Sequence, residues 1–339
     1  MTLRAVALRY LGILLLVLAP GAEALAGASP GTPVVDHHTH LNAPAIQAFL
    51  PEFCAAVKHL GGCDPALTAT HSPADLLAAM DKAGIGRALV LSDGYLAQSP
   101  MMNPQRPDAA ALMRAANDWT VALARRHPAR LAAFIAVDPL RPTALGEIAR
   151  WRGDPAVRGV KLHLTASGVD LRNSRHLAAL AGVFRAAAGA RLALLVHLRT
   201  TRSDYGAVDV QHFLEAVLPS AGTTPVQIAH AGGWGGLDAP TLSALGAFAD
   251  AFQAHPERFR HVWFDLSGVW SGHGSAPDRQ ALVVLMRRIG IGHFLPGSDW
   301  PYNGDSLAEY YGRGYPQLPL TKKEWAIIRA NVAPYAKAR

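Results

Sequence analysis

Short apolar runs alternate with longer stretches of helical periodicity along most of the chain. Eight runs have the length and composition of buried strands: residues 34–38, 87–92, 131–137, 159–164, 192–197, 226–230, 261–266 and 294–298. The stretches between them carry helix signals, such as the capping box Thr321-Lys322-Lys323-Glu324, and prolines after His127 and His255 that should end two helices. Strands that alternate with helices are typical of parallel sheets with right-handed crossovers. Eight such units predict an α/β fold, a single (β/α)8 TIM barrel over residues 33–337, rather than an open doubly wound sheet.

The first 26 residues have a different pattern, which is typical of a secretory signal peptide. Arg4 and Arg9 precede an apolar stretch over residues 11–18, and Ala24-Leu25-Ala26 resembles a cleavage site. The apolar stretch is shorter than the roughly 20 residues of a membrane span, although an uncleaved anchor is the alternative. We therefore expect an exported protein, periplasmic or secreted, with no stable membrane span after removal of residues 1–26.

The two cysteines of the chain, Cys54 and Cys63, are nine positions apart. In an oxidising compartment such a pair can close a small loop as a disulfide, and two free buried thiols are the alternative. The formal net charge is +7, but Lys and Arg are scattered along the chain. A nucleic-acid partner is therefore not expected, and the charge indicates no more than a mild preference for anionic small molecules.

Polar side chains stand at the carboxyl ends of the predicted strands, where the active sites of (β/α)8 barrels lie. They are Asp36, His38, His40, Asp93, Asp138, Lys161, His163, His197, His230, Asp265 and Asp299. His38 and His40 are two apart on one strand, so their rings should point to the same side and could bind one cation. Each histidine could instead simply end a strand, but His197 and His230 close apolar runs, where an unpartnered ring is costly. Imidazole and carboxylate ligands suit zinc, manganese or iron.

Several of these segments together resemble the amidohydrolase superfamily, in particular its amidohydrolase-related branch of metal-dependent hydrolases and decarboxylases. The segments are Asp36-x-His38-x-His40, Leu195-Val196-His197, Ile228-Ala229-His230-Ala231-Gly232-Gly233 and Gly297-Ser298-Asp299-Trp300-Pro301. Gly159-Val160-Lys161-Leu162-His163 and Phe264-Asp265-Leu266-Ser267-Gly268 also resemble that branch. The likeness covers about residues 34–335.

The resemblance implies one divalent metal ion, zinc before manganese or iron. Its implied ligands are His38, His40, His197 and Asp299. His230 would lie close by as an acid/base or oxyanion-stabilising group, and Asp299 could also accept a proton from an activated water. In some members of the superfamily a strand-4 lysine is carbamylated and bridges two metals, so Lys161 leaves a two-metal site open.

Residues on the loops after the strands should select the substrate, because barrel enzymes vary their chemistry through these loops. The loop candidates are Arg199, Arg202, Trp234 and Trp300, with Arg106, Arg172, Trp270, His273 and Tyr302 as further ones, and Lys161 and His163 on the fourth strand could also contact the substrate. Arg199 and Arg202 follow His197 closely and could hold a carboxylate with a bidentate guanidinium. Each could equally be an ordinary surface or packing residue. A homo-oligomer is possible.

Three functions follow from this set of residues. The first is an exported metal-dependent hydrolase that uses activated water on an amide, ester or lactone of a small, perhaps carboxylated molecule. The second is a metal-dependent non-oxidative decarboxylase or hydratase, which the same branch contains. The third, a non-catalytic binding protein on a degenerate barrel, is disfavoured because such a protein has little reason to keep these polar groups at buried strand ends.

Overall fold

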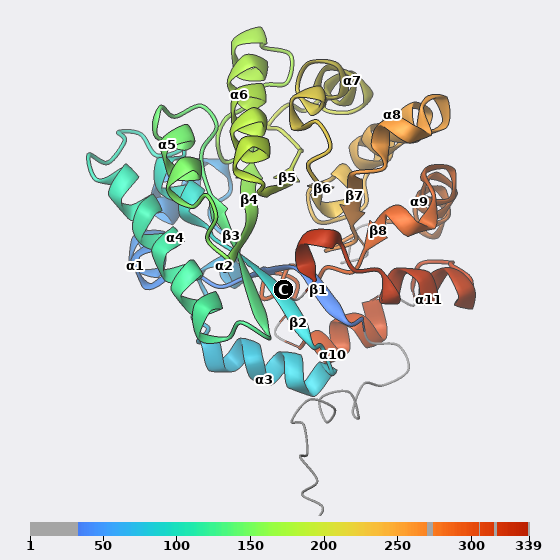
Figure 1. Ribbon diagram of the computed structural model, residues 1–339, viewed down its shortest axis with the longest axis horizontal. Helices are drawn as coiled ribbons and strands as arrows, with labels where there is room; N and C mark the ends of the chain where they lie inside the picture. The colour runs from blue at the N-terminus through green and yellow to red at the C-terminus, as the bar shows by residue number, and fades with distance from the viewer. Residues whose placement is uncertain (1–32, 270–273, 305, 315–316, 338–339) are drawn as a thin grey trace, which may run out of the picture.

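The computed structural model describes residues 33–269, 274–304, 306–314 and 317–337, and Figure 1 shows their arrangement. Eight parallel strands follow one another around a nearly closed barrel in the order β1 to β8, and the helices surround it. The predicted (β/α)8 barrel is confirmed. The predicted signal peptide and the loop residues Trp270 and His273 lie outside the described residues. No described helix combines the length and apolar character that a membrane crossing requires.

The strands are short and almost entirely buried. They are β1 Val35–His40, β2 Arg87–Leu91, β3 Leu131–Ala136, β4 Val157–His163, β5 Ala193–His197, β6 Val226–Ile228, β7 Val262–Asp265 and β8 Phe294–Leu295. The α-helices are α1 Pro44–Ala56, α2 Pro65–Thr68, α3 Pro73–Ala83, α4 Ala109–Arg126, α5 Thr143–Arg150, α6 Ser174–Ala190, α7 Ala207–Ala216, α8 Ala239–Ala254, α9 Ala276–Ile289, α10 Leu307–Glu309 and α11 Lys322–Ala330. The 3-10 turns include η1 Lys58–Leu60 between α1 and α2, η2 Gly94–Gln98 after β2 and η4 Ala229–Gly232 after β6.

The helix boundaries follow the local signals in the sequence. Thr321 and Glu324 form the predicted capping box at the start of α11, with each side chain bonded to the backbone N–H of the other. His127 and His255 lie directly after the last residues of α4 and α8. Both histidines are therefore boundary residues, as predicted, because the following proline disfavours helical backbone at the residue before it.

Two strands end two or more residues earlier than the sequence predicts. β6 stops before His230, because His230 and Ala231 have φ angles of 53° and 52°, in the left-handed region that no strand contains. β8 contains only two residues, since the next one, Pro296, has no N–H to continue the ladder. A predicted site residue follows soon after each early end, His230 after β6 and Asp299 after β8.

The barrel closes between β1 and the segment after β8, through the residues that carry predicted ligands. Thr39 and Trp300 form a parallel bridge. The carbonyl of His38 accepts a hydrogen bond from the N–H of Asp299 at 2.7 Å, and the N–H of His40 donates to the carbonyl of Trp300 at 2.6 Å. The backbone pairing that closes the barrel therefore also fixes three predicted ligands relative to one another.

β1 does not have the plain alternation that the sequence suggested. One extra residue is inserted between Asp36 and Thr39 relative to β2, which is a β-bulge. The buried carboxylate of Asp36 supports the bulge, because its Oδ1 accepts from the N–H of His38 at 3.1 Å and from that of Ser298 at 3.0 Å. Burial raises the pKa of Asp36 to about 7, against the lowering effect of these hydrogen bonds.

The barrel interior contains an apolar cluster of side chains. Leu89, Leu91, Phe134 and Leu195 are fully buried there, and Tyr335 near the carboxyl terminus packs edge-on against the Phe134 ring. An interior filled with side chains is a packed core rather than a channel. Ionisable groups inside the barrel are consequently concentrated at the carboxyl ends of the strands.

Candidate metal centre and active site

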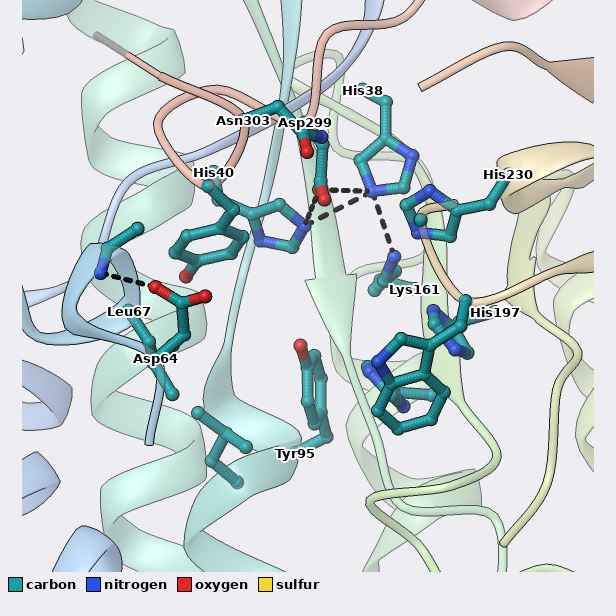
Figure 2. A pocket seen from close by; sticks show the side chains of 16 residues that line it. His38, His40, Asp64, Leu67, Tyr95, Lys161, His197, His230, Asp299 and Asn303 are labelled. Atoms are coloured by element: carbon teal, nitrogen blue, oxygen red, sulfur yellow. Dashed lines mark hydrogen bonds and ion pairs between the residues drawn. The ribbon is translucent and has the colours of Figure 1, made fainter. Parts of the chain in front are cut away.

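Three donor atoms from opposite ends of the chain converge at the carboxyl ends of the strands. Nε2 of His38 lies 3.2 Å from Nε2 of His40, and Oδ1 of Asp299 lies 3.2 Å and 3.4 Å from these two nitrogens. Figure 2 shows the three side chains pointing toward one another. The two rings converge even though β1 is bulged, so the irregular strand still directs both rings toward one point.

Buried carboxylates hold both histidine rings by their other nitrogen. Nδ1 of His38 lies 3.0 Å from Oδ2 of Asp265, and Nδ1 of His40 lies 2.8 Å from Oδ1 of Asp93. A carboxylate only accepts hydrogen bonds, so each ring carries its proton on Nδ1 and presents the Nε2 lone pair to the centre. Metal-binding histidines are oriented in this way in proteins. The sequence placed both carboxylates at strand ends but did not assign them this role.

Asp265 is the most extensively bonded carboxylate of the centre. Besides the His38 ring it accepts hydrogen bonds from the Gln227 amide at 2.6 Å, from the N–H of His230 at 3.0 Å and from the Ser267 hydroxyl at 2.5 Å. Burial favours the protonated form, but His38, His230 and Ser267 together hold the pKa of Asp265 below its ordinary value. Burial lowers the pKa of His38 to about 4, which keeps its ring neutral. A neutral ring is the form that binds a metal.

His230 is fixed with its Nε2 lone pair available. Its Nδ1 lies 2.9 Å from the carbonyl oxygen of Ser267, which can only accept, so Nδ1 carries the proton. Its ring lies 4.9 Å from the His38 ring, centroid to centroid. His230, Ala231 and Asp299 are three of the four non-glycine residues with positive φ in the described part of the chain. Such backbone strain clusters at functional sites, where the surrounding structure enforces it.

Lys161, on β4 as predicted, lies inside the centre. Its Nζ is 3.2 Å from Nε2 of His38, and the side chain is almost completely buried. Burial lowers the pKa of Lys161, and the nearby carboxylates of Asp299, Asp265 and Asp93 oppose that shift. The lysine therefore contributes a partly compensated positive charge beside the three converging donors.

His197, the fourth predicted ligand, stands somewhat apart from these donors. The donor atoms of His38, His40 and Asp299 lie within 4.8 Å of one another, and His197 is not in that group. Its ring stacks on the His163 ring at 3.9 Å and 11°, and lies 5.0 Å from the His230 ring. Within the described residues, nothing hydrogen-bonds its buried Nε2. Burial lowers the pKa of both His197 and His163 well below the ordinary value, so both rings are neutral.

A pocket of about 420 Å³ opens over the centre. Its walls include predicted site residues and others: His38, His40, Asp64, Leu67, Tyr95, Leu96, Lys161, His163, His197, His230, Trp234, Gly235, Asp299, Tyr302 and Asn303. The sequence did not indicate Tyr95, which donates to Oδ1 of Asp93 at 3.0 Å. Its position two residues after a strand-end aspartate was the available signal. Tyr302, whose hydroxyl lies 3.2 Å from Oδ2 of Asp93, was only a loop candidate.

The other substrate-binding candidates are distributed differently. Trp234 is half exposed at the pocket wall, whereas Trp300 is 1% exposed, belongs to the apolar core and faces the His71 ring. Arg199 pairs with both carboxylate oxygens of Asp238, at 3.0 and 2.9 Å. Further ion pairs engage Arg202 with Asp204, Arg172 with Asp204 and Asp209, and Arg106 with Glu52 and Asp108. The structure thus brings Lys161, His163 and Trp234 to the pocket, but not Trp300.

The donor set at the centre fits a divalent cation. Two neutral imidazole nitrogens and one carboxylate oxygen converge, the rings are fixed by buried carboxylates, and the buried Nε2 of His197 has no hydrogen-bond donor in the described residues. Nitrogen and oxygen ligands of this kind bind zinc, manganese and iron. His38, His40 and Asp299 would hold the ion, with His197 as the remaining nitrogen.

The disulfide between Cys54 and Cys63 links α1 to the loop before α2, with 5.2 Å between the two Cα atoms. The loop that it closes contains η1 and runs beside the entrance of the site, since Asp64 and Leu67 directly beyond it line the pocket. A crosslink at this position restrains part of the pocket wall.

Comparisons with known proteins identify the family of the chain and agree with its fold. The sequence profile described as amidohydrolase matches residues 35–323. No curated protein matches the chain. The structure is similar to that of 5-carboxyvanillate decarboxylase from Sphingomonas paucimobilis, with a TM-score of 0.60 and 18% identity over 91% of this chain and 99% of the other.

Two further structures have the same fold. The 5-carboxyvanillate decarboxylase from Novosphingobium aromaticivorans, complexed with manganese and 4-hydroxy-3-methoxy-5-nitrobenzoic acid, gives a TM-score of 0.55 and 15% identity over 91% of this chain and 95% of the other. An amidohydrolase from Burkholderia multivorans with bound zinc gives 0.55 and 17% over 90% and 99%. Because the profile spans most of the barrel, the chain belongs to the amidohydrolase family.

Proposed function

We propose that the protein is a metal-dependent hydrolase that cleaves an amide, ester or lactone of a small, carboxylated molecule. The observation that supports this function most directly is the convergence of His38, His40 and Asp299 next to His230, whose Nε2 carries a lone pair. The group contains both the ligands for a cation and a proton acceptor that is not among the three converging donors.

The side chains around the pocket have distinct roles in this reaction. A divalent cation held by the donors would polarise the scissile carbonyl and lower the pKa of a water molecule. His230 accepts the proton that water loses as its oxygen bonds to the carbonyl carbon, and returns that proton to the leaving nitrogen or oxygen as the old bond breaks. Asp299 faces the same pocket and is a second proton acceptor.

The lysine in the pocket wall supports a carboxylated substrate, although the carboxylates of Asp64 and Asp299 also line the pocket. Among the described residues that line it, Lys161 is the one lysine or arginine, and it lies beside His38. A substrate carboxylate next to this ammonium group would gain a charge-assisted hydrogen bond.

A substrate panel tests the proposal. The full chain is produced with its export segment, the mature protein is loaded with zinc or manganese, and acid release is measured on esters, lactones and amides that carry a free carboxylate. We expect the wild-type protein to lose turnover on chelation and to regain it when the metal is added back. The His38→Ala variant should show no turnover. Tight metal binding without any product would favour the non-catalytic binding protein instead.

A decarboxylase is the second candidate. It is supported by the two similar structures that are 5-carboxyvanillate decarboxylases, and by the aromatic character of one pocket wall. There the stacked His163 and His197 rings meet Trp234, which lies at 90° to the His197 ring at 5.1 Å. Carbon dioxide release from aromatic carboxylates, with no acid release from the ester and amide panel, would establish this reaction in place of hydrolysis.

We propose zinc as the cation, with manganese as the alternative, because similar structures contain either metal. Elemental analysis of active protein should give one metal ion per chain. Two ions per chain would favour a carbamylated Lys161 that bridges them.

We also propose that the protein is exported to the periplasm or beyond the cell. The layout of residues 1–26 supports this location, and so does the Cys54–Cys63 disulfide, since disulfides persist in oxidising compartments. Sequencing the amino terminus of the mature protein should give a start at Gly27. A chain that begins at Met1 would contradict cleavage. Light scattering of the same sample would reveal whether it is a homo-oligomer.

A further inference from the structure

A second cavity, of about 540 Å³, adjoins the site pocket. The two cavities share the side chains of Asp64, Leu67, Leu96, His163 and Trp234, so they adjoin at these residues. The volume alone is within the range of about 300–1,000 Å³ typical of small-ligand sites. A molecule bound at the metal centre can therefore extend past His163 and Trp234 into a second compartment.

The walls of this compartment are mainly apolar. Phe53, Val57, Leu60, Leu67, Leu96 and Met101 contribute to them, and we call the compartment the apolar groove. Leu60 and Trp234 are 61% and 52% exposed, and they are two of the most exposed large apolar side chains of the described residues. Large apolar groups left in water next to a binding pocket are typical of a ligand-binding surface.

The two arginines of the groove are already paired, and the Asp64 carboxylate accepts a hydrogen bond from the N–H of Ala66. Arg199 lies within 3.0 Å of Asp238, and Arg202 within 2.9 Å of Asp204. An anionic group in the groove would have to compete with these ion pairs. An uncharged group would only displace water from the apolar walls, which is favourable without any rearrangement of the arginines.

We propose that the substrate is bipartite, with a polar reacting head in the site pocket and an uncharged alkyl or acyl chain in the apolar groove. This inference rests on the proposed metal-dependent function, which supplies the reacting head. The Cys54–Cys63 disulfide restrains part of the groove wall. The loop that it closes carries Val57 and Leu60, and Cys63 itself also lines the groove. The crosslink keeps this wall in position relative to the metal centre.

Alkyl hydroxamates of increasing length test the inference without any turnover. Their head group chelates metals, and only their chain length changes. With zinc-loaded protein we measure Kd by calorimetry for acetohydroxamate, butyrohydroxamate and octanohydroxamate. Each methylene buried in the groove should tighten binding by up to about fourfold. We expect octanohydroxamate to bind at least about tenfold more tightly than butyrohydroxamate.

Substitutions in the groove wall test whether the gain in affinity with chain length arises there. Leu60→Asp and Met101→Asp should each remove most of the gain with chain length and leave the Kd of acetohydroxamate unchanged. Leu145→Asp is the matched control, because Leu145 is 51% exposed on α5 and does not line the groove, and it should leave the whole series unchanged. Circular dichroism verifies that each variant is folded.

The outcomes separate this inference from the proposed function. Zinc-dependent binding of acetohydroxamate with no gain for the longer chains would overturn the bipartite substrate while leaving the metal centre intact. A gain that survives both groove variants would also overturn it. Zinc-loaded protein that does not bind acetohydroxamate at all would instead contradict the proposed function.

Discussion

The metal centre and the apolar groove lie side by side but are built in different ways. The side chains of the centre come from strands or the residues soon after them and are buried or nearly so, and buried carboxylates hold two of the rings, as Asp265 holds His38. The groove wall comes from α1, η1, α2, η2 and the loops after β4, β5 and β6, it includes exposed side chains, and a disulfide crosslinks it. The barrel thus fixes the chemistry, and the segments after its strands are free to select the substrate.

Strained backbone is a second feature of the metal centre. His230 and Asp299 have positive φ angles at the centre, although neither is a glycine. Strain of this kind persists only where the surroundings enforce it. Here the hydrogen bonds of the backbone N–H groups to Asp265 and to His38 do so. The centre is therefore preorganised, and changes within it should have larger effects than changes in the groove.

Removal of a predicted ligand should have the largest effect. Asp299→Asn keeps the size of the side chain, and asparagine tolerates the left-handed backbone. We expect bound metal to fall to a small fraction and turnover to fall by about a thousandfold or more, because the polarising ion is lost. Metal analysis and steady-state kinetics measure both quantities. Normal metal content in this variant would show that Asp299 is not a ligand.

Substitution of His230 should separate catalysis from metal binding. His230→Asn should retain the metal and lower kcat by about 100- to 1,000-fold, as expected for loss of a proton-transfer group. His127→Asn is the control, since His127 lies at the end of α4 outside the site. If kcat were unchanged while metal was retained, His230 would have no catalytic role.

Asp265 is a positioning residue, and its effect should be smaller. Asp265→Asn should weaken metal affinity by about 10- to 100-fold, because the His38 ring loses the carboxylate that fixes its orientation and tautomer. Competition with a chelator measures the affinity. A purely structural role would lower the melting temperature and leave the metal affinity of the folded protein unchanged.

The disulfide should affect the groove and not the centre. Removing it in the double variant Cys54→Ser, Cys63→Ser should lower the free energy of unfolding by about 2–3 kcal/mol, since a short loop is no longer closed in the unfolded chain. Binding of octanohydroxamate should weaken severalfold at unchanged metal content. Equal weakening of acetohydroxamate would indicate that the crosslink also supports the metal centre, and would remove the contrast between the two regions.

Asp138 follows β3 but lies outside the described pocket lining, so its substitution should have the smallest effect on the chemistry. Burial raises the pKa of its carboxyl from 3.8 to about 6, so the folded protein binds the proton more tightly than the unfolded chain does. The stabilisation from this proton is complete below about pH 4 and is lost as the pH rises through 6. Asp138→Asn does not titrate.

Urea unfolding at a series of pH values measures this contribution. Relative to the wild type, the free energy of unfolding of Asp138→Asn should increase by about 2–3 kcal/mol between pH 4 and pH 7. Metal content and kcat should not change. A loss of metal would place Asp138 in the centre, whereas a pH-independent difference would show that its pKa is not raised.

Much of the fold was predictable from the sequence because its signals are local. The eight apolar runs, the proline and capping signals around the helices and the polar residues after each strand all lie within a few positions of one another. The early end of β8 had a local signal in Pro296, which has no N–H to continue a ladder. The early end of β6 was less accessible, because it depends on left-handed backbone at His230, and an apolar run gives no sign of that.

The sequence by itself determined the eight strands, the polar residues at their ends and the likeness to the amidohydrolase branch. Only the tertiary structure decided which nitrogen each histidine presents, because the deciding carboxylate lies 227 positions from His38 in the case of Asp265. It also decided that Arg199 and Arg202 are already paired, and that Trp300 packs in the core. The physical reason is that tautomers, ion pairs and cavities depend on atoms brought together from distant segments. Strand and helix periodicity depends only on consecutive residues.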